Sequence, residues 1–392
     1  MSSASAQGLG LLTLAAFLPS SQLQVLLFFF SLYLVAVGQG GHKPCVQAFG
    51  ADQFDGQDAE ECKAKRSFFN WCIKGDGESP FVIIGKVYIA TLRNWRTTPS
   101  AIASEEESRG TLPHQSSEQF RFLNKALLAP DYLKENGKAC TIAEVEEAKA
   151  VLRLLPIWAT CLAYAIVFAQ CSTFFTKQGA TMDRTVVPGF EIPAASLQSF
   201  VSLAIIIFIP IYDRILVPIA RAFTREPSGI TMLQRIGTGM FLSIISMAVA
   251  ALGEIKRLQT AKDYDLVDMP SATVPMSVWW LVPQYLLFGL ADVFTLVGLQ
   301  EFFYDQVPNE LRSVGLALYL SINGVGSFLS SFLICVIEEA TSAAGDTIWF
   351  SNNLNRAHLY YFYWLLAALS SVQLVIYIYF AKSYTYNRGG TM

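Results

Sequence analysis

The chain has 392 residues, of which 53% are hydrophobic and only 15% are charged. Soluble domains carry about 25% charged residues, and several apolar stretches here exceed the roughly 18 residues that mark a membrane-spanning helix. The composition therefore excludes an ordinary soluble protein and indicates an integral membrane protein. The net charge of −3 argues against a nucleic-acid partner, because nucleic-acid-binding surfaces are strongly basic.

Eight stretches are candidates for membrane spans. The first is short and weak, and only Ser20-Ser-Gln separates it from the second, so these two are expected to form a hairpin. The other six lie in the second half, mostly with short connections, and are expected to form a self-contained bundle. The eight stretches are residues 6–19, 23–49, 151–175, 194–222, 232–253, 278–303, 316–337 and 359–381. The sequence thus predicts an all-α membrane protein with about eight transmembrane helices.

A long polar stretch separates the two groups of spans. It contains Glu105-Glu-Glu and Pro113, and the patterns at 81–95 and 118–128 predict two short amphipathic helices. We expect these helices to lie on the membrane surface or against the bundle. The predicted parts are an N-terminal pair of spans (1–71), a central loop (72–148), a six-helix half (149–383) and a tail (384–392).

Basic residues near the ends of the spans predict the orientation of the chain. Short connections rich in Lys and Arg stay in the cytosol, which places the central loop and the tail there. The basic residues on this side are Arg221, Arg225, Arg235, Arg312, Lys382 and Arg388. Lys256, Arg257 and Lys262 fall on the opposite side and weaken the signal.

Motifs for catalysis or metal binding are missing from the sequence. His42, His114 and His358 are scattered, and no serine–histidine–acid set is evident. The seven cysteines form no Cys-x-x-Cys pair and are expected to be free thiols. We therefore predict no enzymatic activity, no metal and no cofactor.

Four blocks of sequence resemble the plant nitrate/peptide transporters, and subfamily 5 in particular. The blocks are residues 38–55 (beginning Gly-Gln-Gly-Gly-His-Lys-Pro), Leu154-Leu-Pro-Ile-Trp-Ala with Ala169-Gln-Cys-Ser-Thr-Phe-Phe, Pro210-Ile-Tyr-Asp-Arg-Ile, and Gln300-Glu-Phe-Phe-Tyr-Asp-Gln-Val-Pro. These proton-dependent oligopeptide transporters belong to the major facilitator superfamily. The resemblance implies a partial fold of that superfamily and proton-coupled transport of nitrate, peptides or related small solutes by alternating access. It also implies residence in the plasma membrane or the vacuolar membrane, with protons as the coupling ion.

The chain departs from this family in two places. Family members have twelve spans, whereas this sequence maps onto spans three and four and spans seven to twelve. The Glu-x-x-Glu-Arg motif of the first span is not found, and after Trp71 the chain turns polar where the family continues into span five. Residues 1–71 therefore look like the remnant of an N-terminal transporter half. We expect impaired transport, or alternatively a non-transporting protein that associates with full-length relatives.

The resemblance implies a proton-coupling pair of Lys43 and Glu301. A charged residue at membrane depth costs roughly 2.5–3.5 kcal/mol, a cost that a partner or a function would explain. Other interpretations stay open. Lys43 could snorkel to the interface, and Glu301 could be an interfacial acid that faces the cytosol.

The resemblance also places a substrate cavity beside the first span of the second half. Phe168 stands where nitrate carriers have a histidine, and it offers no donor to an anion, which weakens a nitrate-specific interpretation. Trp158 and Tyr164 could be packing residues, Gln198 could cap its helix, and Asp292 could also touch the cavity. The predicted cavity residues are Phe168, Gln170, Ser172, Gln198, Trp158 and Tyr164.

Two further features are expected to be structural. Asp213 and Arg214 are interpreted as a charge pair on the cytosolic side. Gly324 and Gly326 follow the small-residue pattern typical of close helix packing in membranes.

Overall fold

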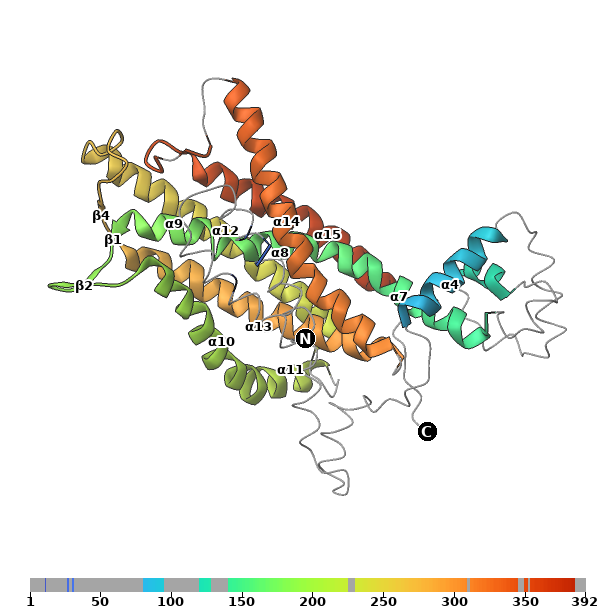
Figure 1. Ribbon diagram of the computed structural model, residues 1–392. Helices are drawn as coiled ribbons and strands as arrows, with labels where there is room; N and C mark the ends of the chain where they lie inside the picture. Colours follow the sequence, from blue (N-terminus) through green and yellow to red (C-terminus); the bar gives the residue numbers. More distant parts are fainter. Residues whose placement is uncertain are drawn as a thin grey trace.

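The computed structural model describes residues 11, 27, 30–31, 80–94, 120–127, 140–224, 230–308, 311–344, 349–351 and 353–384. Apart from the first four of these positions, the two spans predicted at 6–19 and 23–49 lie outside the described residues, and so does Lys43. The six spans predicted for the second half lie almost entirely within them (Figure 1).

The first span of the second half is bent and divided into three helices, α7 (Ile142–Thr160), α8 (Leu162–Gln170) and α9 (Phe174–Ala180). The axis turns by 43° between α7 and the segment that follows. A capping box starts α7, since the Thr141 hydroxyl accepts from the Glu144 N–H and the Glu144 carboxylate accepts from the Thr141 N–H. The predicted span 151–175 was therefore too short. The polar residues between the capping box and the apolar run already belong to the helix. This helix also crosses the boundary predicted between 148 and 149.

The other five predicted spans are also helical. Among the described residues, five helical segments are long and apolar enough to cross a membrane, and there are six if the bent α7–α9 segment is one span. All six stretches predicted as spans in the second half are thus helical. The five segments are η2 (Ala194–Gln198) with α10 (Ser199–Ile211), η3 (Tyr212–Leu216) and α11 (Val217–Thr224); α12 (Met232–Asp263); η4 (Val278–Leu281) with α13 (Val282–Asp305); α14 (Arg312–Ala344); and α15 (Leu359–Ser383).

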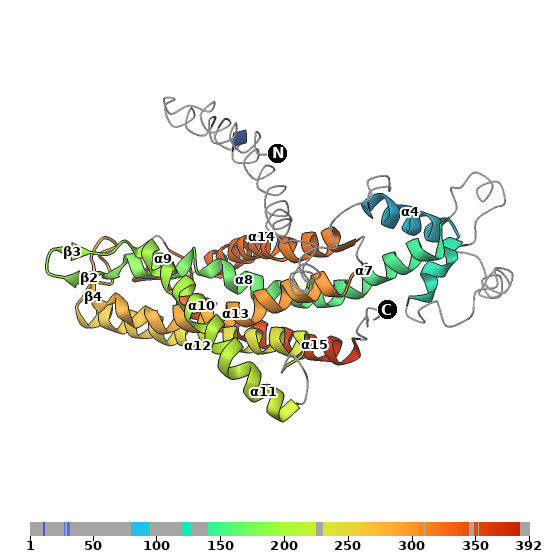
Figure 2. The same cartoon turned by 90° about the horizontal axis from the view of Figure 1, so that it is seen from below.

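The helices pack around α13. In Figure 2, α8 and α14 lie on one side of α13, and α12 and α15 lie on the other. Gly326 lets α14 approach α8 closely, because a Cβ atom built there would lie 2.2 Å from the Cβ of Ala165. At Gly324 a Cβ would meet nothing within 4 Å. The packing role is thus confirmed for Gly326 and wrong for Gly324, which faces away from its neighbours.

A small separate cluster forms at the start of α7 (Figure 1). Here α4 (Pro80–Arg93) and the 3-10 helix η1 (Arg121–Leu127) pack against α7 and bury Val87, Leu123 and Val145. Lys86 of α4 pairs with Glu144 of α7 at 3.9 Å. Both predicted amphipathic segments are therefore helical, and they lie against the start of α7.

Within the described ranges, four short strands interrupt the helical pattern at one end of the body. β1 (Met182–Asp183) pairs in parallel with β4 (Val274–Ser277), and β2 (Thr185–Val187) forms a hairpin with β3 (Phe190–Glu191). Gly189 turns this hairpin with a φ of +86°, which favours glycine. We call this end the strand end.

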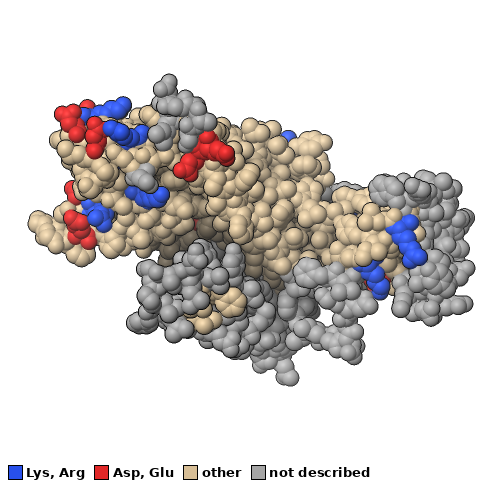
Figure 3. Space-filling model, turned by 45° about the horizontal axis from the view of Figure 1, so that its top comes forward, with Lys and Arg blue, Asp and Glu red and all other residues tan. Residues whose placement is uncertain are grey.

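The opposite end carries Arg221, Arg235, Arg312 and Lys382, and we call it the basic end. Between the two ends the surface carries few charged residues. Figure 3 shows few Lys, Arg, Asp or Glu side chains over the middle of the body, more of them toward the strand end and a few at the opposite extreme. Many large hydrophobic side chains of the spans are exposed, among them Ile206, Phe328 and Val375. Such a surface suits contact with the hydrocarbon core of a bilayer.

Candidate functional site

Glu301 of α13 lies at the basic end and pairs with Arg235 of α12. The Glu301 Oε2 and Arg235 Nη1 atoms are 3.5 Å apart, and the side chains are 43% and 13% exposed. The Arg235 guanidinium also lies 4.3 Å from the centre of the Tyr212 ring. The cation of this pair is thus held by an aromatic ring, whereas the acid is half-exposed. Because Lys43 lies outside the described residues, the Lys43–Glu301 pair stays a prediction.

The sequence analysis missed Arg235 as a partner and used it only to predict orientation. A signal was available. Arg235 is in the first turn of one predicted span, and Glu301 is close to the end of the next. Consecutive antiparallel helices bring such positions to the same end of a bundle.

A second acid, Asp292, is buried deeper in α13. Its carboxylate accepts a short hydrogen bond from the Tyr164 hydroxyl of α8, and both side chains are buried. No Lys, Arg or His within the described part of the chain forms an ion pair with Asp292. The rings of Tyr164 and Phe168 both contact Phe288 of α13, with centroids 6.1 and 6.0 Å apart. The structure therefore places these predicted cavity residues against α13.

Two other predicted cavity residues connect to α14. The Trp158 indole N–H donates to the Ser321 hydroxyl at 2.9 Å. The Gln170 side-chain amide donates to the Ser330 hydroxyl at 2.9 Å and is completely buried. These bonds join α7 and α8 to α14, so both side chains have a packing role here whether or not a solute also reaches them.

The remaining predicted residues lie elsewhere. Ser172 is exposed and donates to the Ala169 carbonyl at 3.2 Å, and Gln198 donates to the Thr176 hydroxyl at 3.1 Å. Arg214 is exposed in the π-helical turn η3. The side chain of Asp213 lies outside the described residues, so the Asp213–Arg214 pair also stays a prediction.

The sequence analysis also missed a buried ion-pair network at the strand end. Arg257 and Glu254 are both fully buried and form two hydrogen bonds of 2.7 and 2.8 Å. Arg257 also donates to the Asn355 side chain at 2.7 Å and to the Leu354 carbonyl at 2.9 Å, while Gln178 donates to Glu254 at 2.8 Å. The pair thereby joins α9, α12 and the segment before α15. It also explains why α12 continues to Asp263, well past the predicted end at 253.

Four cysteines among the described residues are free, namely Cys140, Cys161, Cys171 and Cys335. Burial raises the pKa of the Cys140 thiol, and the nearby Glu144 raises it further. This thiol therefore stays protonated and is a poor nucleophile. Within the part of the chain that the structure describes, no three His, Cys, Asp or Glu side chains gather where they could hold a metal ion.

The sequence matches known transporters over most of its length. A family model described as the POT family matches residues 1–75 and 72–350. The Arabidopsis thaliana proteins NRT1/PTR FAMILY 5.10 and NRT1/PTR FAMILY 5.12 are 57% and 52% identical to the chain, over 97% of it and over 79% and 78% of their own lengths.

These matches contain an internal interruption. The two matched segments of the family model meet at residues 72–75, beside the break predicted after Trp71. The alignment with NRT1/PTR FAMILY 5.10 spans 445 positions, which exceeds the 392 residues of the chain by 53. At least 53 aligned positions of that relative therefore have no counterpart here.

The fold agrees with these matches. The crystal structure of the POT family transporter PepTSo aligns with a TM-score of 0.64 at 17% identity, covering 97% of this chain and 82% of that one. The crystal structure of an auto inhibited POT family peptide transporter aligns with a TM-score of 0.63 at 18% identity, covering 100% and 83%. The family match and the identity to curated relatives establish that this chain belongs to the POT family of membrane transporters.

Proposed function

We propose that the protein is a proton-coupled secondary transporter of nitrate, peptides or related small solutes that works by alternating access. Family membership supports transport, and the six-helix second half supplies one of the two units that move relative to each other in such carriers. The resemblance further suggests the plasma membrane or the vacuolar membrane as its location.

The position of Glu301 is the observation that carries proton coupling. Its carboxylate is half-exposed at the basic end, and Arg235 is its only ion-pair partner among the described residues. Ion pairs open to water contribute only about 0–1 kcal/mol, and this one is long and has a half-exposed acid, so protonation of Glu301 can break it at little cost. Arg235 would stay over Tyr212, and α13 would lose its ionic connection to α12. By resemblance, Lys43 is the second cation that competes for the same acid.

Asp292 is a second proton-binding candidate on the same helix. An ionisable side chain within a membrane span marks a functional site by default, and this one has a tyrosine hydroxyl as its hydrogen-bond partner. A neutral Asp292 fits its buried position, because a lone carboxylate there would be uncompensated.

We further propose that transport by this chain is slow. The solute site of such carriers lies between two halves, and the internal interruption beside Trp71 falls in the first of them. A first half that lacks these aligned positions would leave one wall of the solute site incomplete.

Uptake into liposomes that contain the purified 392-residue chain tests the proposal. Radiolabelled nitrate and dialanine serve as probes, with and without an inward proton gradient, and NRT1/PTR FAMILY 5.10 serves as the reference protein. We expect uptake that rises with the gradient and is at least about tenfold slower than that of the reference. No uptake above that of empty liposomes would contradict transport, and a rate equal to the reference would contradict the impairment.

A further inference from the structure

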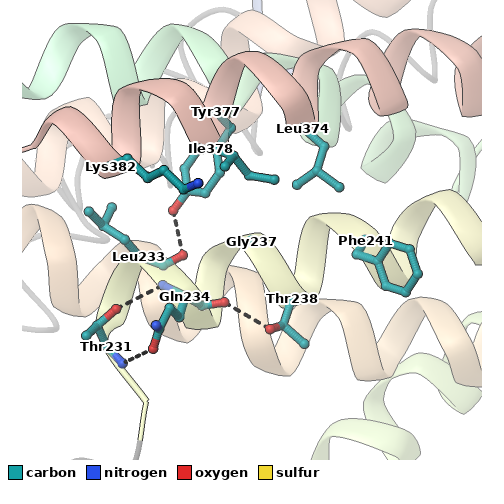
Figure 4. A pocket seen from close by; sticks show the side chains of 11 residues that line it. Thr231, Leu233, Gln234, Gly237, Thr238, Phe241, Leu374, Tyr377, Ile378 and Lys382 are labelled. Carbon is teal, nitrogen blue, oxygen red and sulfur yellow. Dashed lines mark hydrogen bonds between the residues drawn. The ribbon is translucent and has the colours of Figure 1, made fainter.

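A groove on the outer surface of the bundle lies between the start of α12 and the end of α15. Its volume is about 590 Å³, within the range of about 300–1,000 Å³ typical of small-molecule sites. Figure 4 shows the side chains that line it. It lies at the basic end, and both helices that form it are candidate membrane spans.

The bottom of the groove is built by a glycine and a tyrosine. The Tyr377 ring is buried, and its hydroxyl donates to the Leu233 carbonyl at 2.8 Å, which fixes the ring against α12. A Cβ atom at Gly237 would lie 3.3 Å from this ring. The missing side chain at Gly237 therefore leaves the space open above a rigid floor.

One end of the groove is apolar, and the other end is polar. Phe241 and Ile378 are 54% and 43% exposed, although both are large hydrophobic side chains. Figure 4 places Phe241 and Leu374 at one end of the groove, and Lys382 and Gln234 at the other. The groove is thus amphipathic along its length.

Two hydrogen-bond donors at the polar end have no partner in the part of the chain that the structure describes. The Gln234 Oε1 atom accepts from the Thr231 N–H in the capping box of α12, which leaves the Nε2 amide group free. The Lys382 ammonium, in the last turn of α15, forms neither an ion pair nor a hydrogen bond there. A cation and an amide N–H₂ that line the same end of the groove from opposite helices suit the oxygens of one phosphate group.

The length of the groove matches one leaflet of a bilayer. Leu374 and Lys382 are eight residues apart on α15, which corresponds to about 12 Å at 1.5 Å per residue. The hydrocarbon core is about 30 Å thick, so each leaflet contributes roughly half of that. A chain of methylene groups that begins at Lys382 and ends beside Phe241 would follow the membrane normal through most of one leaflet.

We propose that this groove binds an anionic phospholipid from the leaflet at the basic end. One acyl chain lies along Phe241, Gly237 and Ile378, and the phosphate lies at Lys382 and Gln234. The basic end is the cytosolic end by the positive-inside rule, and the cytosolic leaflet is the one that is rich in anionic lipids. Charge complementarity therefore favours an anionic headgroup over a zwitterionic one.

Native mass spectrometry of the full-length chain in detergent tests this proposal. Phosphatidylglycerol or phosphatidylcholine with identical acyl chains is added, and the apparent affinity for the first bound lipid is measured. We expect the wild type to prefer phosphatidylglycerol about fivefold, the effect of one lysine near the surface. Lys382→Gln should remove this preference. Lys262→Gln, which changes the last-turn lysine of α12 at the strand end, should keep it.

A second pair of variants tests the position of the acyl chain. Thr238→Trp fills the groove and should lower binding of both lipids severalfold. Thr260→Trp is the matched control, because Thr238 and Thr260 both lie on α12 and both donate to the carbonyl four residues earlier, at 2.9 and 3.0 Å. Circular dichroism checks that both variants fold. If Thr238→Trp does not fold, the comparison of Lys382→Gln with the wild type still tests the proposal.

Three results would overturn the proposal. The first is equal affinity of the wild type for the two lipids. The second is an equal effect of Lys382→Gln and Lys262→Gln. The third is severalfold stronger lipid binding after deletion of residues 385–392, because that result would identify the tail of the chain as the occupant of the groove.

Discussion

Two arginine–carboxylate pairs of the spanning helices, one at each end of the bundle, differ in burial and in their number of partners. At the strand end, Glu254 and Arg257 are fully buried, and Asn355, Leu354 and Gln178 supply further hydrogen bonds. At the basic end, Glu301 is 43% exposed and reaches Arg235 at 3.5 Å. The first pair can only hold elements together, whereas the second can exchange partners. The contrast supports a scaffolding role for the Glu254–Arg257 pair and, in our proposal, a switching role for the Glu301–Arg235 pair.

Breaking the strand-end pair should have the largest effect. Glu254→Gln leaves Arg257 charged and buried without its counter-ion, so the free energy of unfolding should fall by about 3–5 kcal/mol. Denaturant titration of the detergent-solubilised chain, followed by circular dichroism, measures it. Glu338→Gln, an exposed acid on α14, is the control. A loss below about 1 kcal/mol for Glu254→Gln would contradict the scaffolding role.

The contact between α8 and α14 lies between the two ends and is also expected to be rigid. Gly326→Ala would place a methyl group 2.2 Å from the Cβ of Ala165, so we expect a loss of about 1–3 kcal/mol from overpacking. The matched control is Gly324→Ala in the same helix, where nothing lies within 4 Å. That control should be neutral, or stabilising by up to about 1 kcal/mol from helix propensity. Equal effects of the two substitutions would show that helix packing does not decide the outcome.

Loss of the Asp292–Tyr164 hydrogen bond should have an intermediate effect on stability, because the two side chains are buried but form few other hydrogen bonds. Tyr164→Phe removes the hydroxyl that donates to the Asp292 carboxylate. A buried polar group left without a partner costs about 1–3 kcal/mol. The double variant with Asp292→Asn measures the coupling between the two residues. Additive effects of the two single substitutions would show that the bond contributes nothing of its own.

The smallest effect on stability is expected at the basic end. Arg235→Gln removes the partner of Glu301, and an exposed pair contributes about 0–1 kcal/mol. The same unfolding titration measures it, with Arg221→Gln as the control at an exposed arginine of this end. A loss as large as that of Glu254→Gln would remove the distinction between the two ends.

The helices of the second half could be predicted from the sequence, because an apolar run long enough to span a membrane has few alternatives to a helix. The ends of the helices could not, since polar groups decide them. Thr141 and Glu144 start α7 before its apolar run begins. Arg257 lies in a segment whose polar sequence predicts a connection between helices. Its burial depends on partners that are distant in sequence, such as Asn355.

The candidate site was only partly predictable for the same reason. Glu301 and the residues on α8 were identified by resemblance to a family, which carries no information on which cation is nearest. Arg235 became a partner only when the packing of α12 against α13 was known. The groove that contains Lys382 was not predicted, because it depends on the missing side chain at Gly237 and on the placement of Tyr377.

The most direct test of the switching role is the ratio of solute uptake with and without an inward proton gradient, measured in liposomes that contain the purified chain or its Glu301→Gln variant. Glu339→Gln, an exposed acid on α14, is the matched control. The account predicts a ratio above one for the wild type and for Glu339→Gln, and a ratio of one for Glu301→Gln. A ratio that Glu301→Gln leaves unchanged would contradict it.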